Sequence, residues 1–258
     1  MDLHLRGKRV LITGASKGIG AAAAEAFAEE GCHLMLAARS GDQLKALTEQ
    51  LRSAHQIDAS AHVVDLRNPA DIARLVKDAS DIDILVNNAG DIPGGTVDKI
   101  DESTWRHAWE LKVFGYINIT RAIYAQMKAR GHGVIVNDIG NAGEKFDANY
   151  ICGSTGNAAL MAFTRALGSK SLADNIRVVG INPGPVGTDR HVTSLKIRAK
   201  NQLGDENRYK EFQKSLPLGR PAHAREIGDL MAFLASDRSG YTSGVIYTVD
   251  GGISAGWG

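Results

Sequence analysis

The chain has 258 residues and a mass of 27.5 kDa, and 43% of its residues are hydrophobic, which suits one well-buried domain. Its 30 Lys and Arg against 29 Asp and Glu leave a net charge of +1 without runs of like charge, so neither nucleic acid nor a membrane is expected as a partner. The N-terminus lacks the apolar stretch of a secretion signal and no apolar run reaches membrane-spanning length, so we expect a cytoplasmic protein.

Apolar runs typical of strands alternate with helical patterns along the chain. The strand-like runs are RVLITG (9–14), HLMLAAR (33–39), AHVVDL (61–66), DILVNNAG (83–90), GVIVND (133–138), IRVVGINPG (176–184) and VIYTVDGG (245–252). The helical patterns cover 21–31, 41–54, 69–79, 101–130, 150–173 and 222–236. Because the strand-like runs are continuously apolar, we expect both faces of the sheet to be covered. The sequence predicts an α/β fold: one doubly wound (Rossmann) seven-stranded parallel sheet with helices on both faces, in a single domain over 1–258.

The long irregular piece of the chain covers 188–216 and is mostly polar and charged, with helix-like patches. It follows the carboxyl end of a predicted strand, where open α/β sheets bind their ligands, so we predict a lid on the substrate side. A solvated surface excursion is the alternative. Its bases either attract an acidic substrate or lie on a solvated helix face; they include Arg190, Lys196, Arg198 and Lys200.

The segment TGASKGIG (13–20) directly follows the first predicted strand and opens the first helix. Glycines there allow a tight turn and a close approach of the backbone to a pyrophosphate, while the helix N-terminus offers free N–H groups. A glycine turn alone is a weak signal, since many such turns bind nothing. The predicted cofactor-binding residues of this turn are Gly14, Ser16, Lys17, Gly18, Ile19 and Gly20.

The spacing of three residues between the first two glycines resembles that of the short-chain dehydrogenase/reductase family, and the resemblance extends over nearly the whole chain. It includes Asp65 at the end of the third strand, NNAG at 87–90, NPGPVGT at 182–188 and VDGG at 249–252. Membership implies a nicotinamide dinucleotide across the carboxyl edge of the sheet. It places Asp65 and Leu66 near the adenine, Asn88, Ala89 and Gly90 along the ribose, and Pro183, Gly184, Val186 and Thr188 around the nicotinamide.

Charge favours NADP(H) over NAD(H). A site for NAD usually places Asp or Glu at the end of the second strand, where it binds the ribose 2′-hydroxyl. This sequence has AARS there, and Arg39 with Lys17 offers two cations to a 2′-phosphate. The alternative is that both are solvated surface cations.

The resemblance also implies a catalytic tyrosine, a lysine one helical turn later, a serine after the fifth strand and an asparagine in the preceding long helix. In this sequence those positions fall on Gly153, Asn157, Gly140 and Lys112. Gly153 and Gly156 each cost a helix about 1 kcal/mol, a penalty that calls for a reason. The glycines at 153 and 140 make room for a bulkier ligand, let a ligand approach the backbone, or mark a nucleotide-binding protein that has lost catalysis.

Three residues are candidate catalytic substitutes. Tyr150 lies about one helical turn before Gly153, so its hydroxyl is a candidate for the vacated volume; a loop tyrosine packing its ring on the surface is the alternative. Lys112 is either an acid whose pKa is lowered by burial or, as we favour, the partner of Asp138 in an ion pair. Asn157 can bind a ribose hydroxyl but has no charge with which to acidify a tyrosine.

The other reactive side chains add no separate site. The eight histidines lack metal-ligand spacing, so no metal is predicted. Cys32 and Cys152 suit a reduced protein, with Cys152 a small buried thiol rather than a nucleophile. Two functions remain: an NADP(H)-dependent oxidoreductase for a small carbonyl or alcohol substrate, and an NADP(H)-binding protein without chemistry. The resemblance also implies a homotetramer, or a homodimer, that packs through the helices at 101–130 and 150–173.

Overall fold

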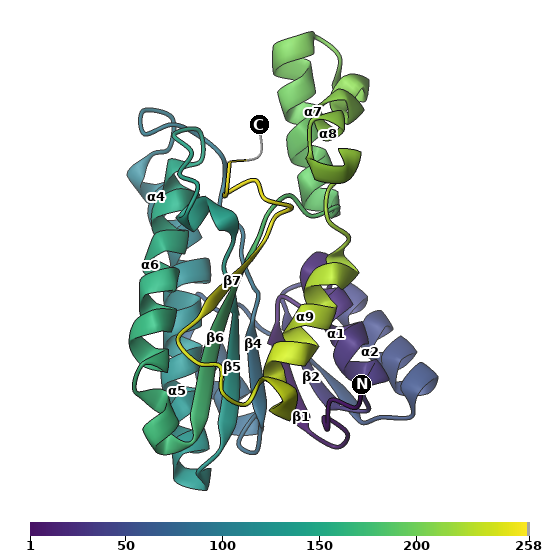
Figure 1. Ribbon diagram of the computed structural model, residues 1–258, viewed down its shortest axis with the longest axis vertical. Helices are drawn as coiled ribbons and strands as arrows, with labels where there is room; N and C mark the ends of the chain where they lie inside the picture. The colour runs from purple at the N-terminus through teal and green to yellow at the C-terminus, as the bar shows by residue number, and fades with distance from the viewer. Residues whose placement is uncertain (257–258) are drawn as a thin grey trace.

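The computed structural model describes residues 1–256 and contains a seven-stranded sheet with helices on both faces (Figure 1). The strand order is β3-β2-β1-β4-β5-β6-β7, and neighbouring strands run parallel. The predicted fold class is therefore confirmed. The strands are β1 (Arg9–Thr13), β2 (His33–Ala38), β3 (Ala59–Val63), β4 (Ile84–Asn87), β5 (Gly133–Asp138), β6 (Ile176–Pro183) and β7 (Ile246–Val249).

Two groups of helices cover the two faces of the sheet. On one face, a shared core joins the central strands to α1 (Gly18–Glu29), α2 (Gly41–His55) and α9 (Ala224–Ala235). The other face carries α3 (Pro69–Asp78) and α5 (Gly115–Arg130), with α6 (Ile151–Gly168) beside α5. Helix α4 (Glu102–Trp109) leads into α5 through a π-helical turn, Glu110–Phe114.

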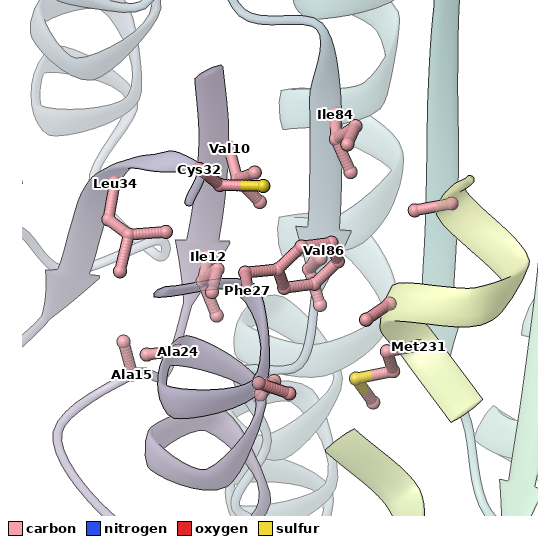
Figure 2. Packing of buried hydrophobic residues seen from close by; sticks show 14 of the residues in the cluster. Val10, Ile12, Ala15, Ala24, Phe27, Cys32, Leu34, Ile84, Val86 and Met231 are labelled. Carbon is pink, nitrogen blue, oxygen red and sulfur yellow. The ribbon is translucent and has the colours of Figure 1, made fainter. Parts of the chain in front are cut away.

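The core beneath α1 and α9 anchors the strand ends that carry the predicted cofactor residues. Figure 2 shows Phe27 of α1 lying over the sheet among side chains such as Ile12 and Val86, with Met231 of α9 beside them. All four of these residues are fully buried. Burying one such side chain contributes about 1.5–3 kcal/mol, so this packing fixes where β1 and β4 end.

Several predicted boundaries differ from the structure. The helix expected over 101–130 contains the π-helical turn, and the one expected over 150–173 ends at Gly168, before a 3₁₀ turn at Ser171–Asp174. The strand expected over 61–66 is β3, which starts two residues earlier, at Ala59, and ends at Val63. β3 is a half-buried edge strand, so its sequence lacks the continuous apolar run that marks the central strands.

The segment after β6 is more helical than the sequence predicted. It contains α7 (Asp189–Leu203), a 3₁₀ turn at Glu206–Tyr209, and α8 (Lys210–Lys214). In Figure 1, α7 and α8 stand beyond the edge of the sheet, separate from the two helical layers. Among residues 1–256, each helix is either too short or too polar to cross a bilayer.

Candidate active site

The turn between β1 and α1 requires glycine. Gly14 and Gly18 have φ values of +68° and +60°, in the left-handed region that other residues rarely adopt. A Cβ on Gly14 would lie 2.7 Å from Ala89 Cα, and one on Gly20 would lie 2.4 Å from the carbonyl oxygen of Gly14. The backbone of the turn therefore packs directly on the NNAG segment that follows β4.

Asn88 holds the glycine turn in place. Its Nδ2 donates to the carbonyl oxygens of Thr13 (2.9 Å) and Gly14 (3.1 Å). The Thr13 hydroxyl accepts from the backbone N–H groups of Asn88 (3.0 Å) and Ala89 (3.2 Å). In this structure the Asn88 amide thus positions the turn, and the chain beyond it, including Gly90, lies along the carboxyl edge of the sheet.

The N-terminus of α1 lies open at the same edge. The helix starts at Gly18, and its N-cap, Lys17, makes no side-chain capping hydrogen bond. Lys17 is exposed, while Ser16 and Ile19 are partly exposed. The first N–H groups of a helix have no partner within it and carry the positive end of its dipole. Together with the glycine backbone, this arrangement fits the pyrophosphate of a dinucleotide.

The NPGPVGT segment reaches this turn from β6. Pro183 ends β6, Gly184 is partly exposed and Val186 is buried. The Thr188 hydroxyl accepts from a backbone N–H to cap α7. Its methyl group would lie 3.2 Å from a Cβ on Gly18. The start of α7 therefore lies beside the glycine turn.

The predicted adenine end of the site is a cluster of charges. The Arg39 guanidinium is about half exposed and lies 3.7 Å from the carboxylate of Asp91. Asp65 accepts from Arg67, with Nη2 to Oδ2 at 2.6 Å, and this contact lowers the pKa of Asp65. Leu66 is buried in the core. Both groups thus have a charged partner: Asp91 lies near Arg39 at the surface, and Arg67 is bonded to Asp65.

Gly153 is covered by the ring of Tyr150. A Cβ on Gly153 would lie 2.0 Å from Tyr150 Cε1 and 2.1 Å from Cζ, far inside van der Waals contact. Tyr150 is the N-cap of α6 and has φ −136° and ψ 38°, outside the helical region. The helix therefore does not yet run at Tyr150. Its ring folds back over the first turn and occupies the space that a side chain at 153 would need.

Tyr150 combines an apolar pocket with a nearby cation. It packs against a buried cluster of Ile92, Ala108 and Cys152, which Trp105 and Trp109 also contact. Burial raises the pKa of the Tyr150 hydroxyl, and the neighbouring guanidinium of Arg190 opposes that rise. Tyr150 is partly exposed, with its ring packed on the first turn of α6 and on this cluster.

Lys112 lies on the π-helical turn and extends toward the same edge of the sheet. Its Nζ donates to the carbonyl oxygen of Ile139 at 2.6 Å, and its Cδ would lie 3.0 Å from a Cβ on Gly90. The favoured ion pair with Asp138 is wrong as a direct contact, because among residues 1–256 no N···O distance within 4 Å joins the two. Asp138 still acts at longer range. Burial lowers the pKa of Lys112 to about 8, while Asp138 raises it and Arg190 lowers it further.

The side chain of Asn157 contacts Gly140, the glycine at the position that the resemblance gives to a serine. Its Nδ2 donates to the carbonyl oxygen of Gly140 at 3.3 Å, and a Cβ on Gly140 would lie 2.9 Å from that nitrogen. Asn157 is only 3% exposed, and its Oδ1 lacks a hydrogen-bond partner among the described residues. A buried acceptor without a donor costs about 1–3 kcal/mol, so this atom suits a ligand hydroxyl.

The residue that sequence reasoning missed is Arg190. It was grouped with the lid bases, but its guanidinium donates to the carbonyl oxygens of Gly90 (3.0 Å) and Ile92 (2.5 Å). Its place two residues after NPGPVGT is the signal that the sequence offers. The structure brings Arg190 and Tyr150 together and leaves Asp65 and Leu66 in other contacts. Within residues 1–256 no three His, Cys, Asp or Glu side chains gather as metal ligands.

Comparison with known proteins identifies close likenesses in sequence and structure. The family model described as short chain dehydrogenase matches residues 8–197. Oxidoreductase UcpA of Escherichia coli O157:H7 is 36% identical over 254 residues, covering 96% of this chain and 95% of that protein. L-sorbose reductase of Gluconobacter frateurii, solved with NADPH and L-sorbose, superposes with a TM-score of 0.92 at 33% identity, covering 99% and 100% of the two chains. NAD⁺-bound xylitol dehydrogenase superposes with a TM-score of 0.89 at 28% identity, covering 96% of this chain and 100% of that chain.

Proposed function

Because the chain belongs to the short-chain dehydrogenase family, we propose that it is an NADP(H)-dependent oxidoreductase that interconverts a carbonyl group and an alcohol on a small molecule. We further propose that Tyr150 is its proton donor and acceptor. The positions that the resemblance gives to the catalytic residues fall on Gly153, Asn157, Gly140 and Lys112, so this proposal has no standard proton donor. The proton must therefore come from another side chain, from the substrate or from water.

The residues of this chain fit a dinucleotide. The glycine turn and the open N-terminus of α1 suit a pyrophosphate, and the unpartnered Oδ1 of Asn157 can accept a hydrogen bond from a ribose hydroxyl. Arg39 and Lys17, with no acid at the end of β2, favour the 2′-phosphate of NADP(H). L-sorbose reductase was solved with NADPH and xylitol dehydrogenase with NAD⁺, so the similar structures include both cofactors. The proposed preference for NADP(H) therefore rests on Arg39 and Lys17.

A bound nicotinamide supplies the hydride for reduction and accepts it in the reverse direction. When hydride adds to a carbonyl carbon, charge develops on the oxygen and one proton must be delivered there. In our proposal the Tyr150 hydroxyl donates that proton and recovers it when the alcohol is oxidised. The Lys112 ammonium and the Asn157 amide hold the backbone around the site through Ile139 and Gly140.

The observation that carries this proposal is the position of the Tyr150 ring. It lies within 2.0 Å of where a side chain at 153 would begin, which is the position that the resemblance gives to the catalytic tyrosine. The Tyr150 ring thus lies beside the backbone of residue 153, although it comes from three residues earlier in the chain, and this nearness supports the proposed role of its hydroxyl.

The test is Tyr150→Phe, assayed against a panel of ketones, aldehydes and alcohols with NADPH and NADP⁺. We expect kcat of the mutant to fall at least about 100-fold, because a general acid usually contributes a factor of this size to the rate. The Kd for NADPH should be unchanged. Tyr241→Phe is the matched control, because Tyr241 is fully exposed and should behave as wild type.

The second candidate, an NADP(H)-binding protein without chemistry, is favoured by the same four replacements. It predicts tight NADPH binding and no turnover in the panel. Turnover that Tyr150→Phe leaves intact would instead show that the proton comes from another group.

The homotetramer or homodimer implied by the family remains a proposal. Phe114, on the turn that leads into α5, is 45% exposed, and such apolar exposure suits burial against a second copy. Sedimentation velocity measures the assembly directly. A single species at the monomer mass of 27.5 kDa would contradict the proposal.

A further inference from the structure

Arg190 ties the lid to the loop that follows β4. It is the second residue of α7. Its Nη1 donates to the carbonyl oxygen of Gly90 at 3.0 Å and its Nη2 to that of Ile92 at 2.5 Å. These two bonds hold the guanidinium against the segment 90–92, although the side chain is otherwise exposed.

The same loop holds Tyr150 from the other side. Gly95 forms an isolated bridge with Tyr150, in which Gly95 N donates to Asn149 O (2.6 Å) and Ile151 N donates to Gly95 O (3.4 Å). The Ile92 side chain packs in the cluster that contains the Tyr150 ring. Residues 90–95 therefore fix the phenol and the guanidinium relative to each other.

The charged and titratable groups that face Tyr150 come from three elements. Arg190 on α7 lowers the pKa of the phenol, whereas Cys152 on α6 and Asp91 in the loop after β4 raise it. Burial raises the pKa of the Cys152 thiol as well, so this thiol is neutral near pH 7. The Asp91 carboxylate already has Arg39 at 3.7 Å. Arg190 is thus the group in this set that favours the ionised phenol.

No carboxylate competes for Arg190 at close range. Among residues 1–256, none of its nitrogens lies within 4 Å of an Asp or Glu oxygen, and its hydrogen bonds go to backbone carbonyl groups. Its charge is therefore not neutralised by a partner and acts on the groups around it. Lys112 is one of those groups, and its own hydrogen bond goes to the carbonyl oxygen of Ile139.

We propose that Arg190 is a positioning residue of this site: the guanidinium stabilises the Tyr150 phenolate, in the place of a lysine on α6, and makes the proton donor depend on the lid. The inference rests on the proposed role of Tyr150. Because Arg190 is carried by α7, any movement of that helix away from the loop 90–95 removes the cation from the phenol. The proton donor is then complete only when the lid covers the substrate, which also excludes water from the reacting oxygen.

The test measures the ionisation of Tyr150 without turnover. The protein is labelled with tyrosine carrying ¹³C at Cζ, and the Tyr150 resonance is assigned by its absence in Tyr150→Phe. Its chemical shift is followed against pH in wild type, Arg190→Met and Arg190→Lys. Lys200→Met is the matched control, because Lys200 is an exposed cation on the same helix. Binding of NADPH, measured by fluorescence, confirms that each variant is folded.

We expect the Tyr150 transition to move up by about one pH unit or more in Arg190→Met and to stay in place in Lys200→Met. Arg190→Lys should restore part of the shift, because it keeps the charge and loses the two-pronged contact with the loop. A transition at the same pH in wild type and Arg190→Met overturns the inference, whatever the enzyme activity.

The pH profile of alcohol oxidation separates this inference from the proposed function. If Tyr150 is the proton acceptor, the rising limb of kcat moves in Arg190→Met by the same interval as the resonance. A resonance that moves while the kinetic limb stays fixed would contradict the role of Tyr150 in catalysis and, with it, the positioning role. A fixed resonance contradicts the coupling between Arg190 and the phenol alone.

Discussion

Replacing Gly153 by alanine tests whether the position of the Tyr150 ring matters for catalysis. The added Cβ would lie 2.0 Å from Cε1 and 2.5 Å from Cδ1 of that ring, where ordinary contact begins near 3.4 Å. The backbone of α6 cannot move by this amount without disturbing the sheet. The tyrosine is a side chain with two rotatable bonds, so the ring must swing away from the first turn.

The expected cost in stability is small, because two effects oppose each other. Alanine gains about 1 kcal/mol over glycine inside a helix. Repacking the displaced ring costs about 1–3 kcal/mol, as other oversized core substitutions do. The net effect therefore lies between neutral and about 2 kcal/mol of destabilisation. For a chain of 258 residues this corresponds to a fall in Tm of less than about 8 °C.

The expected cost in activity is large. With the phenol displaced, kcat should fall at least about 100-fold, to the level of Tyr150→Phe, while the Kd for NADPH stays unchanged. The assay measures kcat, NADPH binding and Tm in parallel. Gly156→Ala is the control on the same helix: the atoms nearest to its Cβ would be Trp109 Nε1 and Val113 Cγ2, each at 3.2 Å, and Ile92 Cδ1 at 3.6 Å. If Gly153→Ala keeps kcat within about twofold of wild type, the ring position has no catalytic role.

Two further substitutions test the cofactor preference and the buried charge. Arg39→Ala should raise the KM for NADPH roughly ten- to hundredfold and leave that for NADH nearly unchanged, because only NADPH carries the 2′-phosphate; an equal effect on both cofactors would contradict the assignment. Burial raises the pKa of Asp138 to about 6, so the folded protein holds this proton more tightly than the unfolded chain, whose pKa is 3.8. The stability that this proton contributes is present below about pH 4 and is lost as the pH rises through about 6. In wild type the Tm should therefore fall between about pH 4 and pH 6, and Asp138→Asn should make that fall smaller. An unchanged slope of Tm against pH in the mutant would refute this assignment.

The fold could be predicted from the sequence because the strands are buried on both faces. Continuous apolar runs such as IRVVGINPG mark a central strand without reference to any contact, and β6 is buried along its whole length. Where burial is partial, the sequence signal weakened, as it did at β3. The helical content of the segment 188–216 was also underestimated. The apolar face of α7 is narrow and its outward residues are charged, so its periodicity is faint.

The candidate site could be predicted only where backbone geometry dictates residue type. The glycine turn is recognisable because its positive φ values and close contacts exclude other residues. The contact between Tyr150 and Gly153 depends on a non-helical N-cap, which sequence spacing does not encode. Lys112 and Arg190 bond to backbone carbonyl groups, and such partners leave no trace in the side-chain sequence.

The space beside the two unexpected glycines is filled from within the chain. The Tyr150 ring covers Gly153, and the Asn157 amide lies where a side chain at 140 would begin. Neither glycine therefore leaves room for a bulkier ligand at its own position. Close packing alone explains why the space is filled, but an apolar side chain would fill it at lower cost. The chain instead places a phenol beside a guanidinium at one position, and a buried amide with an unpartnered oxygen at the other. Polar groups retained at such a cost favour a site that binds and transfers protons over one that has decayed.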